Sequence, residues 1–271
     1  MSNPTLQHQM EAATAYEALF VPALFRQFAP KVADAAGVSN GQRVLDVACG
    51  TGALAREILR RVGPRGLVSG IDAVPGMIEV ARDIAPAVDW RVGRAESLPF
   101  SDGSFDAVVS QFGLMFFTDR AQAIREMLRV LSSRGRFAVA VWDSLHNIPA
   151  YAAADELLQR TLGQQASDAL RAPFTLGDRD ELSKMFSEAG AKAVDVSTHS
   201  GTAVFPSIRT MVEADLRGWL PVMGVNLSEE QISQTLHEAE TALAAFAMSD
   251  GQVRFPLSAH IVAGCPSAIP T

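Results

Sequence analysis

Hydrophobic residues in the first half of the chain follow two alternating patterns. Short apolar runs typical of buried strands occur at 44–48, 67–72, 88–92, 105–110 and 136–142. Between several of these runs, apolar residues recur every three or four positions, which indicates helices. Leu54, Ile58 and Val62 show this spacing after the first run. Strands separated by helices in this way predict a parallel sheet covered on both faces.

After Trp142 the pattern becomes mostly helical. Helical spacing is found at 151–162, 178–190 and in two stretches within 207–247, and strand-like runs at 192–199 and 252–263. The first forty residues also have helical spacing, broken near Pro22. We therefore expect an N-terminal helical arm or lid at 1–40, a sheet domain formed by 41–200 and 250–265, and a helical cap inserted at 201–249.

Composition limits the class of protein. Of the 271 residues, 48% are hydrophobic and 20% are charged, which is enough apolar material for a folded core. The formal net charge of −7 argues against a nucleic-acid partner, which would need a basic face. The two cysteines, Cys49 and Cys265, are too few for a disulfide framework or a cysteine-rich metal site. The N-terminus lacks the pattern of a signal peptide, and the densest apolar stretch, 137–142, is too short for a membrane span. These features predict a cytoplasmic protein that binds no metal.

A glycine-rich turn is the most informative local feature. Gly50-Thr51-Gly52 lies where the first strand passes into a helix. Glycine permits a tight turn and close approach of a ligand, and the helix start presents free N–H groups. Asp72 ends the second strand, twenty residues after Gly52, where its carboxylate can accept hydrogen bonds from ribose hydroxyls. The combination predicts a ligand that contains a nucleoside.

Two kinds of nucleoside ligand fit this turn. Residues 50–55 match the G-x-G-x-x-A fingerprint of dinucleotide binding, which would indicate an NAD-dependent oxidoreductase. Asp46, however, lies four residues before Gly50 and would place a negative charge near the pyrophosphate. A ligand that carries an ammonium and a sulfonium group would be stabilised there instead. The oxidoreductase remains the alternative hypothesis.

Several motifs together resemble a known family. They are Val44–Gly52, Gly70–Asp72 followed by Met77, Ala95–Phe100, Ser104–Asp106 and Glu126–Leu131. In this order, over roughly residues 40–145, they are similar to the class I S-adenosylmethionine-dependent methyltransferases. The most similar subgroup has the type 11 methyltransferase domain and includes the ubiquinone/menaquinone biosynthesis C-methyltransferases.

The resemblance implies a fold and a set of cofactor-binding residues. The fold would be a Rossmann-like, doubly wound α/β sheet of seven mainly parallel strands in the order 3-2-1-4-5-7-6, with the last strand antiparallel and a helical lid insertion. S-adenosylmethionine would be the cofactor. Asp46 and the backbone of Ala48, Cys49, Gly50, Thr51 and Gly52 would hold its methionine end, Asp72 its ribose, Ala73 and Met77 its adenine, Ala95 and Glu96 the adenine edge, and Gln111 its amino group.

The sequence departs from the family pattern in ways that bear on the acceptor. Arg94 replaces a frequent aspartate and cannot accept a hydrogen bond from adenine, so it either stacks on the purine or faces solvent. Residues 111–114 lack the Asn/Asp-Pro-Pro-Tyr/Phe turn of nucleobase- and glutamine-methylating relatives, and Met115–Phe117 differ from the quinone enzymes. The candidates for an apolar acceptor pocket are Met115, Phe116, Phe117, Trp219 and Met223. We expect transfer of a methyl group to oxygen, carbon or nitrogen of a small, fairly apolar acceptor.

A general base is needed only if the acceptor must lose a proton. His146 follows the fifth strand and is our candidate for that base, with Asp143 to orient it. A non-catalytic relative that binds the cofactor is a third hypothesis, because direct transfer needs no recognisable catalytic residue. The oligomeric state stays open, a homodimer included.

Overall fold

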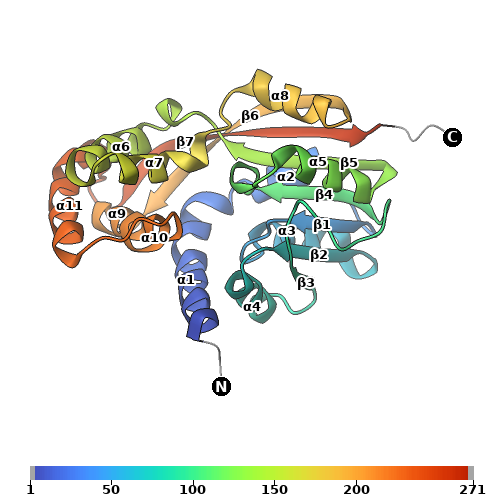
Figure 1. Cartoon of the computed structure of the whole chain (residues 1–271), viewed down its shortest axis with the longest axis horizontal. Coiled ribbons are helices and arrows are strands. Elements are labelled where there is room, and N and C mark those ends of the chain that lie inside the picture. The colour runs from blue at the N-terminus through green and yellow to red at the C-terminus, as the bar shows by residue number, and fades with distance from the viewer. Residues whose placement is uncertain (1–3, 268–271) are drawn as a thin grey trace.

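Seven strands form one sheet in the computed structural model, which describes residues 4–267 (Figure 1). They are β1 (Arg43–Val47), β2 (Leu67–Asp72), β3 (Asp89–Val92), β4 (Phe105–Gln111), β5 (Leu131–Trp142), β6 (Ala191–Phe205) and β7 (Val253–Pro266). Their order is β3-β2-β1-β4-β5-β7-β6. Strands β1 to β5 pair in parallel, whereas β7 runs antiparallel to both β5 and β6. The predicted fold class is confirmed.

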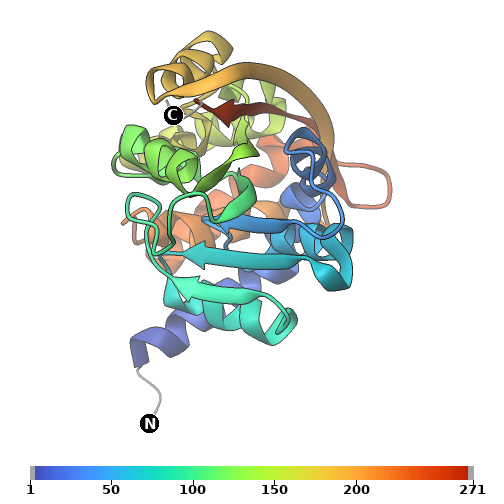
Figure 2. The ribbon, with the colours of Figure 1, turned by 90° about the vertical axis from the view of Figure 1, so that its right-hand side faces the viewer.

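Helices cover both faces of the sheet (Figure 2). They are α2 (Ala29–Ala35), α3 (Ala53–Val62) and α4 (Pro75–Ile84) on one face, and α5 (Arg120–Val130) and α8 (Arg179–Glu188) on the other. The chain steps outward from β1 to β2 and β3, then returns to β4 and β5. Because such crossovers are right-handed, the reversal places α3 and α4 opposite α5. A crevice is therefore expected at the carboxyl ends of β1 and β4, where the direction changes.

The strand boundaries differ most from the sequence prediction at two places. Strand β5 begins at Leu131, five residues before the predicted start at 136, because α5 ends at Val130. Strand β6 extends six residues beyond the predicted end at His199, to Phe205. The extension alternates exposed residues with the buried Ala203 and Phe205, as expected for a strand with only one covered face.

Strands β6 and β7 continue past the end of β5 as a two-stranded ribbon. They pair as far as Phe205 and Val253, whereas β5 pairs with β7 only up to Trp142 and Ala259. The ribbon carries α9 (Ile208–Ala214), the π-helical turn η6 (Asp215–Trp219), α10 (Leu220–Val222) and α11 (Glu229–Ala242). These elements form a cap beside the carboxyl end of the sheet (Figure 1).

The cap also includes a second part of the chain. Helices α6 (Pro149–Leu162) and α7 (Gln164–Arg171) pack on the segment that follows β6. The indole N–H of Trp219 donates to the carbonyl of Ala169 at 2.8 Å, and Arg160 pairs with Glu238 of α11. The predicted insertion at 201–249 is therefore only part of the cap in this structure.

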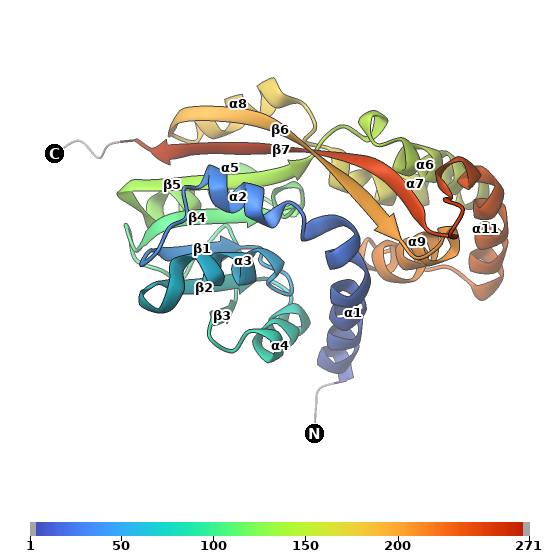
Figure 3. The same cartoon turned by 180° about the vertical axis from the view of Figure 1, so that it is seen from behind.

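The N-terminal arm runs from the cap side to the sheet domain (Figure 3). Helix α1 (Pro4–Phe20) packs on α4, and the π-helical turn η1 (Val21–Phe25) follows where Pro22 interrupts the helix. Residues 1–3 of the predicted arm lie outside the described residues. Within the described part of the chain, no helix is both long enough and apolar enough to cross a membrane.

Candidate functional site

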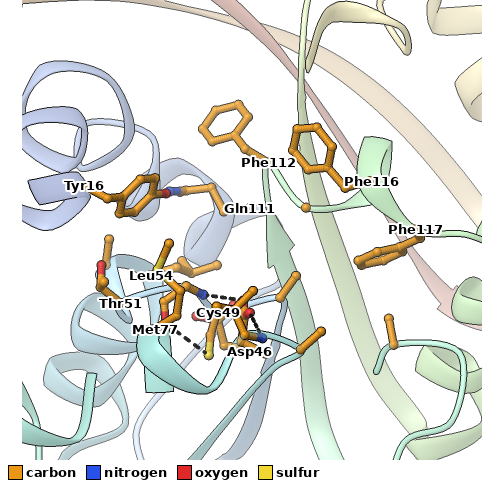
Figure 4. A pocket seen from close by; sticks show the side chains of 18 of the residues that line it. Tyr16, Asp46, Cys49, Thr51, Leu54, Met77, Gln111, Phe112, Phe116 and Phe117 are labelled. Atoms are coloured by element: carbon orange, nitrogen blue, oxygen red, sulfur yellow. Dashed lines mark hydrogen bonds between the residues drawn. The ribbon is translucent and has the colours of Figure 1, made fainter. Parts of the chain in front are cut away.

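A cavity of about 370 Å³ lies at the carboxyl ends of the central strands (Figure 4). Of the twelve predicted cofactor-binding residues, the cavity is lined by eleven: Asp46, Ala48, Cys49, Gly50, Thr51, Asp72, Ala73, Met77, Ala95, Glu96 and Gln111. Further lining residues are Tyr16, Phe25, Leu54, Arg94, Phe112, Phe116, Phe117, Trp219 and Met223, among others. The sheet, the arm and the cap all contribute to this cavity.

Gly52, the twelfth predicted residue, lies behind the turn rather than in the wall of the cavity. A Cβ atom there would be 2.4 Å from Cη2 of Trp90. Trp90 is buried and donates its indole N–H to the carbonyl of Ala85 at 2.8 Å. Gly52 also has a φ of +86°, in the left-handed region that disfavours side chains. This glycine therefore permits the turn to pack on Trp90.

Asp46 brings an unpartnered carboxyl group to the cavity. Its side chain is 1% exposed, and among the described residues neither of its oxygens has a hydrogen-bond partner. Burial raises its pKa well above the usual range, the backbone N–H of Ala55 opposes this shift, and Asp72 adds to it. Burying a carboxyl group without a hydrogen-bond donor costs free energy of folding. The site therefore fits a ligand that brings positive charge and N–H groups.

Gln111 adds a second unpartnered acceptor. Its side-chain nitrogen donates to the carbonyl of Phe25 at 3.3 Å, which leaves Oε1 buried without a partner in the described structure. The side chain extends toward Tyr16 across the cavity (Figure 4). With Asp46, the cavity thus offers three buried acceptor oxygens to one ligand.

Asp72 is bound to the glycine turn. Its carboxylate accepts hydrogen bonds from the backbone N–H of Gly50 and of Val74, each at 2.9 Å. Burial raises the pKa of Asp72, and these two hydrogen bonds act in the opposite direction. Each carboxylate oxygen has a further lone pair, so Asp72 can fix the turn and still accept hydrogen bonds from a ligand.

The N-terminal arm closes the other side of the turn. The hydroxyl of Thr51 donates to the carboxylate of Glu17 at 2.6 Å, and Arg56 pairs with the same carboxylate at 2.7 Å. Tyr16, the preceding residue, is a wall of the cavity. Burial raises the pKa of Tyr16, and the neighbouring carboxyl groups of Asp72 and Glu17 add to the shift.

At the predicted adenine edge, Glu96 is bound to the neighbouring loop through one carboxylate oxygen. Oε1 of Glu96 accepts the backbone N–H of Thr118 at 2.8 Å, and Arg94 donates to the Thr118 hydroxyl at 2.9 Å. Burial raises the pKa of Glu96, but backbone N–H groups, including those of Thr118 and Asp119, and the charge of Arg94 bring it below its usual value. Among the described residues all hydrogen bonds to the Glu96 side chain use Oε1, so Oε2 and the backbone around Ala95 are both available for polar contacts in the cavity.

A second, smaller chamber adjoins the cavity. It has a volume of about 120 Å³. Five aromatic residues line both spaces: Tyr16, Phe25, Phe112, Phe116 and Trp219. Further into the chamber lie Phe20, Trp142, Tyr151, Phe174 and Asp215. Of the predicted acceptor-pocket residues, Phe116 and Trp219 thus occupy the boundary between the two spaces, with ring centroids 5.2 Å apart.

The predicted base does not reach either space. His146 and Asp143 line a separate groove between β5, β6 and the segment before α8, which shares no lining residue with the other two. Asp143 accepts hydrogen bonds from Ser258 at 2.7 Å and lies 3.1 Å from Nε2 of His260. It therefore orients His260 and not His146. Burial raises the pKa of Asp143, but its hydrogen bonds, Ser258 first, bring it below the usual value.

In the described range, 4–267, no three or more His, Cys, Asp or Glu side chains are grouped to hold a metal ion. The cavity is lined by carboxyl, amide and aromatic side chains around a glycine turn.

Comparison with known proteins identifies the central segment. Residues 45–139 match a family model described as a methyltransferase domain. This segment is therefore similar to methyltransferase domains. The match begins in β1, ends in β5 and includes the glycine turn, Asp72 and Gln111. It confirms the resemblance to S-adenosylmethionine-dependent methyltransferases that the motifs indicated.

One curated relative of the methyltransferase domain is the ubiquinone/menaquinone biosynthesis C-methyltransferase UbiE of Pseudomonas entomophila. It is 45% identical over 109 residues, which cover 38% of this chain and 43% of the relative. The chain thus aligns with less than half the length of the first curated relatives it matches.

Solved structures show that the fold is shared more widely. The YcgJ protein of Bacillus subtilis superposes with a TM-score of 0.57 at 22% identity, over 88% of this chain and 97% of that one. A second solved structure is phosphoethanolamine N-methyltransferase 2 of Haemonchus contortus, in complex with phosphomonomethylethanolamine and S-adenosylhomocysteine. It superposes with a TM-score of 0.60 at 17% sequence identity, over 96% of this chain and 58% of that one.

Proposed function

We propose that this protein is an S-adenosylmethionine-dependent methyltransferase that acts on a small, fairly apolar acceptor. One observation carries the proposal: the carboxyl group of Asp46 and Oε1 of Gln111 are buried in the cavity without donors. The amino group of S-adenosylmethionine carries three N–H donors and a positive charge. It would satisfy both side chains in one binding event.

The remaining lining residues fit the other parts of this cofactor. Asp72 would accept hydrogen bonds from the ribose hydroxyls through its free lone pairs, and Ala73 and Met77 would pack against the adenine. The backbone around Ala95 would meet the adenine edge. Arg94 is 59% exposed and bonded to Thr118, which favours a role in holding the loop rather than in stacking on the purine.

When bound, the cofactor supplies an activated methyl group on sulfur. The protein's own contribution is alignment and exclusion of water, which together can lower a barrier by several kcal/mol. The arm covers the glycine turn, and Trp219 and Met223 of the cap face the same cavity. The aromatic chamber beyond Phe112 and Phe116 is the space from which an acceptor would approach.

The proteins that this chain is similar to differ in the accepting atom. The curated relative named above is a C-methyltransferase, whereas the Haemonchus contortus protein is an N-methyltransferase. One fold supports different acceptors, and the site decides between them. Oxygen, carbon and nitrogen therefore remain the candidate atoms at this level of the proposal.

The NAD hypothesis is disfavoured by the geometry of the turn. A pyrophosphate at this position would need the backbone N–H groups of the turn as donors. The N–H of Gly50 already donates to Asp72, and the carboxyl group of Asp46 lies in the same cavity. A phosphate would meet two acidic side chains there.

The proposal is tested by supplying S-adenosylmethionine labelled on its methyl group together with a panel of small apolar amines, phenols and carbon acids. We expect label in an organic product and release of S-adenosylhomocysteine. Binding of S-adenosylhomocysteine without turnover of any acceptor would favour the non-catalytic hypothesis. Binding of NADH, followed by its fluorescence, in place of S-adenosylhomocysteine would contradict the proposal.

A further inference from the structure

Asp215 is the acidic residue that lines the aromatic chamber. The other lining residues are nine aromatic side chains, three leucines and a proline. Asp215 begins the π-helical turn η6 and is 5% exposed. A carboxyl group among aromatic rings is unusual, because an unpaired buried charge costs several kcal/mol.

The carboxyl group of Asp215 has no hydrogen bond or ion pair with any residue in the described part of the chain, although its backbone N–H and C=O are paired within the helix. Its neighbours in sequence do have partners: Arg217 of the same turn pairs with Glu213 at 2.9 Å and with Glu229 at 2.7 Å. Tyr151 is the titratable group whose pKa responds to Asp215, and its hydroxyl likewise has no hydrogen bond among the described residues. Two polar groups in one apolar chamber thus have no protein partner.

We propose that this chamber binds the methyl acceptor as a primary or secondary amine, with its ammonium group held by Asp215 among the aromatic rings. The inference rests on the proposed function and adds the substrate class. Aromatic faces attract cations, and a carboxylate gives the charge a direct partner. The same residues offer nothing comparable to an anion.

The carboxylate also gives the amine a way to become a nucleophile. An ammonium ion has no lone pair, so it must first lose a proton. Asp215 takes that proton and becomes a neutral carboxylic acid, which leaves a neutral amine. The nitrogen lone pair then forms the new bond to the methyl carbon as the bond from that carbon to sulfur breaks. The electron pair of the broken bond stays on sulfur, and the methylated nitrogen carries the positive charge.

Burial supports a proton-accepting role. It raises the pKa of Asp215 to about 8, which is much closer to the pKa of an amine than the ordinary value of a carboxyl group. A neutral alcohol brings no charge that would keep the carboxyl group ionised in this environment, whereas an ammonium ion does. The chamber should therefore bind an ammonium ion in preference to a neutral alcohol.

The volume limits the size of the amine. An engineered apolar cavity of about 150 Å³ holds one benzene ring. The chamber is somewhat smaller, at about 120 Å³, so a one-ring amine would extend past the shared aromatic walls into the larger cavity. Benzylamine and benzyl alcohol are therefore matched probes, since they have nearly the same shape but differ in charge.

The test measures binding of each probe to the protein saturated with S-adenosylhomocysteine, by calorimetry. We expect benzylamine to bind at least tenfold more tightly than benzyl alcohol. In Asp215→Asn this preference should be lost, while the affinity for S-adenosylhomocysteine stays unchanged because Asp215 does not line the cofactor cavity. The unchanged affinity also shows that the variant is folded. Glu213→Gln is the matched control: it removes one charge two residues away, on an exposed side chain paired with Arg217, and should keep the preference.

A second variant keeps the inference testable if Asp215→Asn fails to fold. Tyr151→Phe removes the neighbouring hydroxyl and leaves the carboxyl group, so the preference for benzylamine should persist in it. Equal binding of the two probes to the wild type, or a preference that survives in Asp215→Asn, would overturn the inference. Failure of the wild type to bind S-adenosylhomocysteine would instead refute the proposed function, so the two failures are distinguishable.

Discussion

The hydroxyl of Thr51, in the glycine turn, donates a hydrogen bond of 2.6 Å to the carboxylate of Glu17, in the N-terminal arm. Arg56, in the first turns of α3, pairs with the same carboxylate and also donates to the carbonyl of Thr51 at 2.7 Å. These contacts join two segments that are more than thirty residues apart in sequence. They make the arm a wall of the cofactor cavity, next to Tyr16.

If the arm retains the cofactor, breaking this contact should speed its release. We predict that Glu17→Ala increases the dissociation rate of S-adenosylhomocysteine by about tenfold, as expected for the loss of a charged hydrogen bond of roughly 1.5 kcal/mol. Stopped-flow displacement measures this rate. Glu11→Ala is the control: Glu11 lies on the same helix and accepts a hydrogen bond only from Gln7 among the described residues, so its rate should match the wild type. Equal rates in the two variants would exclude a retaining role for the arm.

The contact between Gly52 and Trp90 should make the turn intolerant of any side chain. We predict that Gly52→Ala lowers the free energy of unfolding by about 2–4 kcal/mol, from a left-handed residue and an overpacked contact together. Urea denaturation checks this. Gly224→Ala separates the two causes, since Gly224 ends a helix with a similar φ of +81° but has open space around its Cβ position. It should lose only about 1 kcal/mol, and a loss as large as that in Gly52→Ala would show that the contact with Trp90 contributes little.

Much of the fold was predictable because each signal was local. Buried strands such as β1 are visible in the sequence as apolar runs. Gly50 and Gly52 indicate the turn whatever packs against it, because both adopt a positive φ. Asp46 and Asp72 were found through their spacing from that turn, and both line one cavity. These positions are set by the backbone of one continuous β-α-β segment.

The residues that sequence reasoning missed come from distant segments. Tyr16 belongs to an aromatic stripe on a helix, and such a stripe looks the same whether it packs in a core or covers a ligand. Asp215 reads as an ordinary acidic residue of a surface helix. It faces the chamber in a π-helical turn, which alters the helical register and is not visible in the periodicity. His146 follows β5 directly, but the short turn 145–147 carries it to the groove beside His260.

The raised pKa of Asp215 predicts a dependence of stability on pH. The folded value of about 8 exceeds the unfolded value of roughly 4, so the folded state retains a proton that the unfolded state loses. The stability from this group is complete below about pH 4, declines as the pH rises and is lost above about pH 8. Relative to Asp215→Asn, the wild type should therefore become less stable by about 2–5 kcal/mol between pH 4 and pH 8.5. Thermal unfolding of the pair across this range measures the difference, and a difference that is constant with pH would contradict a buried, unpaired carboxyl group.

Binding of the cofactor should release a proton from Asp46. Its pKa is raised in the free protein, and an ammonium group beside it would stabilise the charged form and lower the pKa. Calorimetry of S-adenosylhomocysteine binding near neutral pH, in phosphate and in Tris, should give enthalpies that differ in proportion to the ionisation enthalpy of the buffer. In Asp46→Asn the two buffers should agree. A buffer difference of the same size in that variant would show that the proton comes from another group.

The account depends most directly on the affinity of S-adenosylhomocysteine for the wild type and for Asp46→Asn, measured in one titration series. Asp83→Asn, which changes an exposed aspartate at the far end of α4, serves as the control. We predict clear binding to the wild type and the control, and an affinity at least tenfold lower in Asp46→Asn, because the amide cannot hold the ammonium charge. No detectable binding to the wild type at millimolar ligand, or equal affinity in all three proteins, would contradict the account.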